Sequence, residues 1–394
     1  LDALLAAGAR VVFEEDPGWR KLDFRRWAAQ QERPDLEHLA RSEHAALGLD
    51  NMGLMIGQGH LHLLLSHSGT RELRGPSPRR STHPTRRNEM KSQIRGVVPP
   101  LAIPLKDGAL DTASLERHIN RMIDAGVHGL FVSGSSGEVA FSTDARRDQV
   151  LAEALRVVDG RVPVLAGVID TETERVIEHI RRAEDSGATG VVATAPFYAL
   201  GGEAEVERHF RILAESTGLE LWAYDIPVCV HTKLSPDLLL RLGRDGVLAG
   251  VKDSSGDDVS FRWLSLANEA AGHPLRLLTG HEVVVDGAYM SGADGSVPGL
   301  GNVDPHGYVR QWQAYERRDW EAVRAEQDRL AELMRIVQVK GVQGFGAGIG
   351  AFKTAMMLLG VFDTNEMPRP VAALEGDNVE WVASVLRGTG LLAG

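Results

Sequence analysis

A lysine ends the apolar stretch VLAGVK (residues 247–252), immediately before a loop of Asp, Ser and Gly. The chain uses lysine sparingly, since seven of its 43 Lys and Arg residues are Lys, so a need for positive charge alone would favour arginine. An amine that loses solvation is neutral more of the time, and neutral amines attack carbonyl carbons to form Schiff bases. Lys252 is therefore a candidate nucleophile. The competing interpretation is a structural lysine paired with Asp253 or another carboxylate.

Two other features could do chemistry beside this amine. Tyr224 ends the apolar run LELWAY 28 residues before Lys252, and a phenol can move protons onto and off a carbinolamine. In isolation Tyr224 could equally be a tyrosine that packs at a rim. The segment GSSGE (134–138) offers two hydroxyls and backbone N–H groups between a predicted strand and a predicted helix, which suits a carboxylate. It lacks the spacing of a phosphate-binding GxxxxGK[ST] loop.

The elements that would position these residues recur regularly from Gly96 onward. The apolar runs are continuous rather than alternating, as in parallel strands covered on both faces. Amphipathic segments lie between them, such as the one that places Leu115, Ile119, Met122 and Ile123 on one face. Eight such units favour a (β/α)8 TIM barrel over a doubly wound sheet. The predicted strands are 97–103, 128–133, 162–168, 189–195, 219–224, 247–252, 275–279 and 293–297.

The barrel predicted over 96–302 is the catalytic part of a longer chain. Beyond it, the sequence predicts a C-terminal helical domain at 303–394, with helices near 303–337, 347–360 and 376–388. Residues 1–65 are expected to form a poorly ordered N-terminal extension of unknown role, with a helix around Leu22–Ala46. Residues 66–95 are rich in Ser, Pro, Gly and Arg and are expected to be a flexible linker. Alternatively, residues before Met90 are not part of the working protein.

Composition excludes several classes of function. The net charge of −11 argues against nucleic acid or an anionic membrane as a partner. The single cysteine, Cys229, excludes an internal disulfide framework and a multi-cysteine metal site, and fits a reducing compartment. No apolar run is long enough to span a bilayer, and no signal-peptide pattern is present. We therefore expect a cytoplasmic protein.

Chemistry in such a barrel belongs at the C-terminal ends of the strands, where Lys252, Tyr224 and the GSSGE segment would meet. Five motifs occur there in order, and together they resemble one family. They are GSSGE (134–138), APFY (195–198), YDIP (224–227), GVKDSSGD (250–257) and GADGSVPGLGNV (292–303). From about Gly96 to its end the chain resembles the dihydrodipicolinate synthase / N-acetylneuraminate lyase family of class I lyases and aldolases.

The resemblance implies a role for each matching residue. Lys252 would form a Schiff base with pyruvate or the keto group of a 2-keto acid, and Tyr224 would transfer protons. Ser135 would relay protons between Tyr224 and Tyr198, and in this family the latter reaches in from a partner subunit. A homodimer or homotetramer is therefore expected, with no cofactor beyond the covalent Schiff base and no metal. The residues expected to hold the keto-acid carboxylate are Gly134, Ser136 and Val297.

Departures from the family pattern bear on the substrate. Family members that make dihydrodipicolinate precursors carry an arginine two residues after the proline of Y-N-[IV]-P, where this chain has Cys229. His231 could supply only a single, pH-dependent charge. Asp225 replaces the usual asparagine and is expected to add negative charge near the entrance. Glu282 could accept hydrogen bonds from substrate hydroxyls. Alternatively, it is a carboxylate at a helix N-terminus with no role in binding.

These features predict a class I lyase, aldolase or dehydratase that acts on a 2-keto-3-deoxy sugar acid or related hydroxy-keto acid, with pyruvate as product or donor. One alternative is 4-hydroxy-tetrahydrodipicolinate synthase, which condenses pyruvate with aspartate semialdehyde. A non-enzyme alternative is a barrel that senses keto acids. The joint presence of Lys252, Tyr224 and neighbouring hydroxyls favours catalysis, because a binding protein would not need both the amine and the phenol.

Overall fold

The structure, a computed structural model, describes residues 10–12, 20–22, 51–57, 60–66 and 94–393 of the 394-residue chain. The chain divides into two units, Leu1–Pro84 and Thr85–Gly394. The second unit contains every motif on which the functional hypothesis rests.

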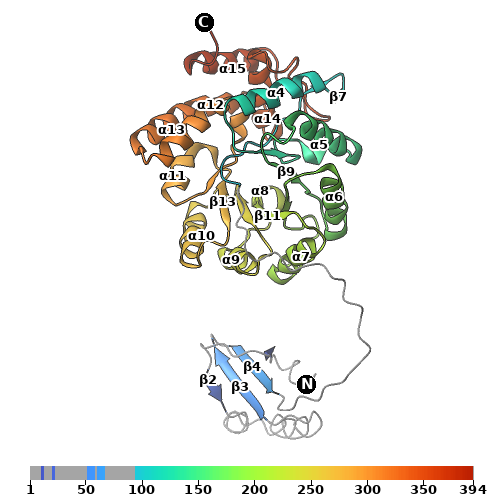
Figure 1. Cartoon of the computed structure of the whole chain (residues 1–394), viewed down its shortest axis with the longest axis vertical. Helices are drawn as coiled ribbons and strands as arrows, with labels where there is room; N and C mark the ends of the chain where they lie inside the picture. Colours follow the sequence, from blue (N-terminus) through green and yellow to red (C-terminus); the bar gives the residue numbers. More distant parts are fainter. Residues whose placement is uncertain (1–9, 13–19, 23–50, 58–59, 67–93, 394) are drawn as a thin grey trace. The chain divides into compact units, whose positions relative to one another are not determined.

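Eight parallel strands form one sheet in the second unit (Figure 1). In chain order they are β5 (Gly96–Val97), β8 (Leu130–Val132), β9 (Val164–Gly167), β10 (Gly190–Thr194), β11 (Glu220–Asp225), β12 (Gly250–Asp253), β13 (Arg276–Thr279) and β14 (Gly295–Ser296). Their order in the sheet is β5-β14-β13-β12-β11-β10-β9-β8. An isolated parallel bridge between Pro100 and Phe131 joins the segment after β5 to β8 and closes the barrel. Strand β5 is short because Pro99 and Pro100 have no N–H to donate.

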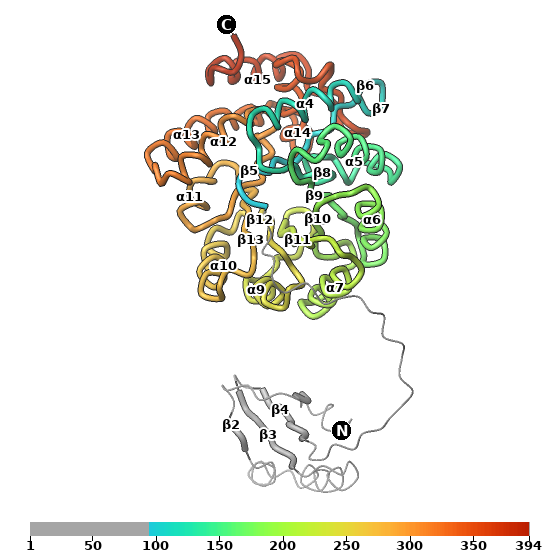
Figure 2. Tube along the Cα trace, in the orientation of Figure 1, coloured from blue at the N-terminus to red at the C-terminus, as the bar shows by residue number. Residues whose placement is uncertain are grey.

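A helix follows each of these strands, and the tube in Figure 2 shows the helices arranged around the strands. They are α4 (Thr112–Asp124), α5 (Asp144–Val158), α6 (Thr173–Ser186), α7 (Glu203–Glu215), α9 (Pro236–Arg244), α10 (Asp258–Ala270), α11 (Val285–Met290) and α12 (Pro305–Glu316). Leu115, Ile119 and Met122 of α4 are fully buried, as the amphipathic pattern predicts. The (β/α)8 prediction is therefore confirmed, with the eighth helix beyond the predicted boundary at residue 302.

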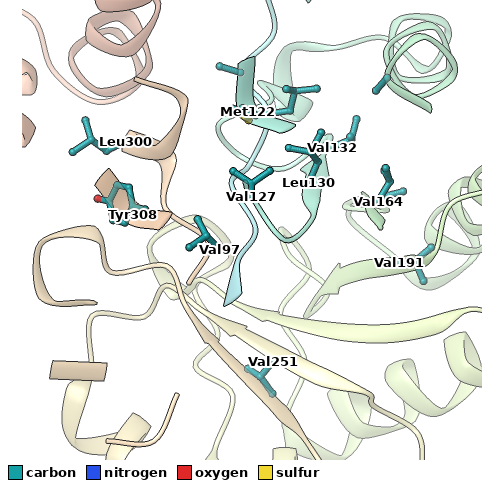
Figure 3. Close-up of a cluster of buried hydrophobic side chains, with 14 of the residues drawn as sticks. Val97, Met122, Val127, Leu130, Val132, Val164, Val191, Val251, Leu300 and Tyr308 are labelled. Atoms are coloured by element: carbon teal, nitrogen blue, oxygen red, sulfur yellow. The ribbon is translucent and has the colours of Figure 1, made fainter. Parts of the chain in front are cut away.

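Successive residues of strands β8 to β11 and of β13 belong alternately to two separate apolar clusters. Leu130 and Val132 of β8 lie in the large cluster between strands and helices, part of which Figure 3 shows. Phe131, between them, belongs to a smaller cluster with Trp222 and Tyr224 of β11. Because successive side chains of a strand point to opposite faces, the smaller cluster lines the barrel interior. This alternation decides which strand residues can reach the functional site.

Further helices follow α12, and they are α13 (Trp320–Met334), α14 (Phe345–Leu358) and α15 (Asp377–Gly388). The predicted helix 303–337 is interrupted between α12 and α13, where Arg318 adopts a left-handed backbone with φ of 59°. Helix α14 is buried along most of its length, in agreement with its apolar sequence. The segment after α14 is tied to α4, because Arg117 donates to the Val361 carbonyl over 3.1 Å and pairs with Asp363 over 2.6 Å.

The shorter elements include one that lies close to the predicted site. Helix α8 (Pro227–Val230) follows β11 directly. The single-turn helices are η1 (Val139–Phe141), η2 (Glu282–Val284), η3 (Gly299–Asn302) and η4 (Arg335–Val337). A two-stranded hairpin, β6 (Leu105–Lys106) and β7 (Ala109–Leu110), follows β5.

The first unit contains a four-stranded sheet that the sequence analysis did not predict. Its strands are β1 (Arg10–Val12), β2 (Arg20–Leu22), β3 (Asn51–Gly57) and β4 (His60–Ser66), in the order β1-β4-β3-β2. Two apolar runs separated by two residues are a hairpin signal, and β3 pairs with β4 in that way. The predicted helix begins at Leu22, which ends β2. Its remaining residues, like 67–93 of the predicted linker, lie outside the described residues.

Candidate active site

Lys252 lies inside the barrel, in strand β12. Its Cα is in register with that of Tyr224 on the neighbouring strand β11. The preceding residue, Val251, belongs to the outer cluster, so the alternation of the strand turns Lys252 toward the interior. The lysine side chain is buried, with 5% of the residue exposed.

Aromatic rings surround the Lys252 amine. Its Nζ lies 3.9 Å from the centroid of the Tyr224 ring and 4.7 Å from that of Phe131. No salt bridge joins Lys252 to any carboxylate of the described residues. The Asp253 carboxylate instead accepts hydrogen bonds from the backbone N–H and the hydroxyl of Ser255, over 2.8 Å and 2.7 Å. The interpretation of Lys252 as the ion-pair partner of Asp253 is therefore wrong.

Two of the three predicted proton-transfer residues lie together. The hydroxyl oxygens of Ser135 and Tyr224 are 3.3 Å apart, and either can donate. Tyr198 lies in the loop after β10, is 95% exposed and has a left-handed backbone with φ of 74°. Within the described part of this chain, no hydrogen bond joins Tyr198 to Ser135. A single chain thus brings together the Tyr224 phenol and the Ser135 hydroxyl, but not Tyr198, the third residue of the predicted relay.

The GSSGE segment forms a tight turn after β8. Glu138, with φ of 57°, donates its backbone N–H to the Ser135 carbonyl over 2.9 Å. A Cβ at Gly134 would lie 2.4 Å from the Phe131 ring, so glycine is required where the loop crosses that ring. The backbone N–H groups of Ser135 and Ser136 donate to no described residue. They are therefore available to a substrate carboxylate, the ligand predicted for this turn.

The predicted eighth-strand segment lies beside this turn. Val297 is buried in the interior cluster and donates its N–H to the Thr279 carbonyl over 2.7 Å. A Cβ at Gly299 would lie 2.5 Å from Glu282 Oε1 and 3.3 Å from the Ser136 hydroxyl, so these two side chains approach one another beside a glycine. Glu282 Oε1 accepts the Leu300 N–H over 2.9 Å. Burial raises the pKa of Glu282, and one of its oxygens is committed to the backbone.

The expectation that Asp225 adds negative charge near the entrance is wrong. Its side chain is fully buried, forms an ion pair with Lys233 and accepts the Leu234 N–H over 3.1 Å. Burial, with a smaller contribution from nearby Asp253, raises the pKa of Asp225 to about 6. Asp225 therefore anchors the loop that follows β11 rather than contacting substrate. The sequence could not reveal this, because the cation that neutralises it comes from the loop itself.

Replacing Asp225 with asparagine is expected to change how stability depends on pH. A carboxyl whose pKa is raised in the folded state binds more protons folded than unfolded, so it lowers the stability as pH rises from about 4 to about 6. The free energy of unfolding of Asp225→Asn, relative to wild type, should therefore increase by about 1 kcal/mol between pH 5 and pH 7. Urea unfolding at both pH values measures this. Asp328→Asn, at an exposed carboxylate, is the control, and a difference that does not change with pH would contradict the assignment.

Cys229 and His231 lie where the departures from the family pattern were noted. Cys229 is an exposed residue of helix α8, and the partial desolvation of its thiol raises the thiol pKa, while the positive charge of Lys252 acts in the opposite direction. His231 is exposed directly after α8, with φ of 55°. Neither the thiol of Cys229 nor the imidazole of His231 can form the bidentate pair with a substrate carboxylate that an arginine at position 229 would form.

Phe131 is a site residue that the sequence analysis did not identify. It contacts the amine of Lys252 and packs edge-on against Tyr224, with ring centroids 6.0 Å apart and an interplanar angle of 84°. An apolar residue in an apolar strand carries no chemical signature. Counting alternate positions along β8 would have placed it inside the barrel.

The described residues contain no group of three or more His, Cys, Asp or Glu side chains that could hold a metal ion. Among them, no helix is both long and apolar enough to cross a membrane.

Known proteins similar to this chain support the family that its motifs predicted. Residues 93–388 match the dihydrodipicolinate synthetase family. An uncharacterized DapA-like lyase of Halobacterium salinarum is 35% identical over 302 residues, which are 76% of this chain and 95% of that protein. A 4-hydroxy-tetrahydrodipicolinate synthase of Methanoculleus marisnigri is 30% identical over 245 residues, 61% of this chain and 83% of that protein.

A solved structure gives the same result. YagE, a prophage protein of the dihydrodipicolinic acid synthase family from E. coli K12 in complex with pyruvate, is 26% identical and has a TM-score of 0.72. The similarity covers 76% of this chain and all of that one, 100%. The predicted resemblance is thus confirmed, and the chain belongs to the dihydrodipicolinate synthetase family, whose enzymes are lyases that use a lysine Schiff base with pyruvate and no external cofactor.

Proposed function

We propose that this protein is a class I lyase that cleaves a 2-keto-3-deoxy sugar acid, or a related hydroxy-keto acid, to pyruvate and an aldehyde. The observation that carries the proposal is the buried Lys252 amine, which lies against the Tyr224 ring and makes no ion pair with a described carboxylate. An amine in this position can add to a ketone, and the neighbouring phenol can move the protons that the addition requires.

The reaction begins with a Schiff base. The neutral amine of Lys252 attacks C2 of the keto acid, while the carboxylate is held by the N–H groups of Ser135 and Ser136. Tyr224 donates a proton to the resulting carbinolamine hydroxyl, which leaves as water and gives a protonated imine. Ser135, 3.3 Å from the phenol oxygen, holds the phenol or its phenolate by a hydrogen bond.

Bond cleavage then uses the protonated imine as an electron sink. Tyr224, now a phenolate, accepts the proton of the C4 hydroxyl, the C3–C4 bond breaks, and its electron pair moves toward the imine to give an enamine. The C4 fragment leaves as an aldehyde. The enamine is protonated at C3, and water hydrolyses the imine to release pyruvate and free Lys252. If a proton is instead removed from C3 of the intact imine, the enamine that forms still carries C4 and can lose the C4 hydroxyl as water, which would make the protein a dehydratase. Product analysis separates the two reactions.

The substrate class is argued from Cys229. Synthase members of the family carry an arginine at this position for the second carboxylate of their aldehyde substrate, and a thiol cannot form that bidentate pair. The exposed Cys229 therefore supports a neutral polyhydroxy chain. The synthase reaction remains the second candidate, because several relatives carry that name.

An assay of pyruvate release from 2-keto-3-deoxygluconate, beside condensation of pyruvate with aspartate semialdehyde, tests the substrate class. We expect release to exceed condensation by at least about tenfold in kcat/KM, and Cys229→Arg to raise condensation because a guanidinium can bind the second carboxylate. Cys229→Ser, which adds no charge, is the matched control. Faster condensation than release by the wild type would assign the synthase activity instead.

We further propose that the enzyme acts as a homodimer or homotetramer in the cytoplasm. Tyr198 and Leu200, in the loop after β10, are 95% and 56% exposed, and Val228 of helix α8, which follows β11, is 79% exposed. Large apolar residues exposed after two neighbouring strands support burial against another molecule. A second copy would cover them and could bring its own Tyr198 toward a site.

A further inference from the structure

Lys353 and Glu138 form a buried ion pair that the proposed reaction does not use. The lysine Nζ lies 2.8 Å from Glu138 Oε2, and the two side chains are 0% and 3% exposed. Lys353 also donates to the Glu366 carbonyl over 2.9 Å. In the part of the chain that the structure describes, no other group hydrogen-bonds the Glu138 carboxylate. Burial raises the pKa of Glu138 and lowers that of Lys353, so each charge depends on the other.

This pair joins two segments that are 215 residues apart. Lys353 belongs to α14, a helix outside the barrel, whereas Glu138 ends the turn that carries Ser135 and Ser136. The N–H of Glu138 donates to the Ser135 carbonyl over 2.9 Å. A change in the backbone conformation of Glu138 would therefore displace the Ser135 carbonyl. The left-handed conformation of Glu138 is sparsely populated and persists where surrounding contacts hold it.

The preceding residue of α14 reaches the other side of the same turn. A Cβ at Gly299 would lie 3.0 Å from Cε2 of the Phe352 ring and 3.3 Å from the Ser136 hydroxyl. Consecutive residues of α14, Phe352 and Lys353, therefore contact both segments predicted to hold the keto-acid carboxylate. A helix outside the barrel contributes to the geometry of the barrel's binding turn.

We propose that Lys353 and Glu138 are positioning residues that hold the Ser135–Ser136 turn in the conformation that binds the keto-acid carboxylate, so that α14 is part of the catalytic unit. This inference rests on the proposed Schiff-base function. Neither residue touches substrate, and both act through the turn. Their loss should weaken the binding of pyruvate more than it slows the chemistry of bound pyruvate.

The test measures the pyruvate concentration that gives half-maximal trapping of the Lys252 adduct by borohydride. This concentration is a property of each folded molecule, so a loss of folded protein alone does not change it. Lys353→Met should raise it by about 10- to 100-fold, the range expected for a small displacement of binding groups. The matched control is Lys106→Met, which removes an exposed lysine paired with Asp363 and should leave the concentration unchanged.

Glu138→Gln provides the second variant, because it preserves side-chain volume and decides the question if Lys353→Met does not fold. It should shift the half-maximal pyruvate concentration in the same direction. Circular dichroism and thermal melting establish that each variant is folded. An unchanged concentration in a folded variant would overturn the positioning role alone. Absence of trapping in the wild type would overturn the proposed function, and the inference with it.

Discussion

Replacing Lys252 with methionine or arginine is expected to abolish turnover. Methionine has nearly the length of lysine but no amine, and the arginine guanidinium stays protonated and cannot add to a carbonyl. Without the covalent intermediate, kcat/KM should fall by on the order of 10⁴-fold or more, since enzymes accelerate such reactions by 10⁶-fold or more. Steady-state assays with the best substrate of the 2-keto acid panel measure this loss.

The size of the loss in kcat/KM distinguishes a nucleophilic role of Lys252 from a purely electrostatic one. A protein that used Lys252 only to attract the substrate carboxylate would retain substantial activity in Lys252→Arg, which keeps the positive charge. Lys106→Arg, at an exposed lysine on the β6–β7 hairpin, should behave as wild type. Retention of more than about a tenth of the wild-type kcat/KM by Lys252→Arg would contradict the assignment.

Tyr224→Phe is expected to have the second largest effect. The substitution keeps the ring that contacts Phe131 and Lys252 and removes the hydroxyl that lies 3.3 Å from Ser135. General acid–base groups contribute about 10²–10⁴-fold, so kcat should fall by about 10²- to 10³-fold while the protein remains folded. The Schiff base should still form, but more slowly, because water must supply the proton.

The control for this variant is Tyr315→Phe. It removes a phenol hydroxyl that donates a hydrogen bond to the Ala293 carbonyl over 3.4 Å, away from the site. Ser135→Ala should lower kcat less than Tyr224→Phe does, because Ser135 acts only through its hydrogen bond to the phenol. Rapid-quench measurement of borohydride-trapped adduct separates slow imine formation from slow cleavage. A decrease in kcat of less than about threefold for Tyr224→Phe would mean that another group transfers the protons.

The barrel was predictable because its signals repeat. Each strand is a short apolar run, each helix has an apolar face, and a covered parallel sheet requires both. Lys252 and Tyr224 could be singled out for a related reason, since each is a polar side chain at the end of an apolar run, and the alternation of the strands turns both toward the barrel interior. The four-stranded sheet of the first unit was not predicted, although the two apolar runs that form β3 and β4 are separated by only two residues, the spacing of a hairpin.

Features that depend on contacts between distant residues were not predictable. The burial of Asp225 depends on Lys233, and the sequence shows both residues but not their ion pair. The contact between Lys353 and Glu138 spans 215 residues and requires knowing where α14 packs. Phe131 was overlooked because its role is to surround the amine, for which any apolar strand residue is a candidate. Tertiary packing decided each of these cases.

The central claim is that Lys252 forms a Schiff base with a 2-keto acid. The most direct test incubates the full chain with pyruvate and borohydride, digests it and identifies the modified peptide by mass spectrometry. We predict that a reduced pyruvyl group is found on Lys252, and that Lys252→Met gives no adduct. An unmodified Lys252, or a stable adduct on another lysine in its place, would contradict the account.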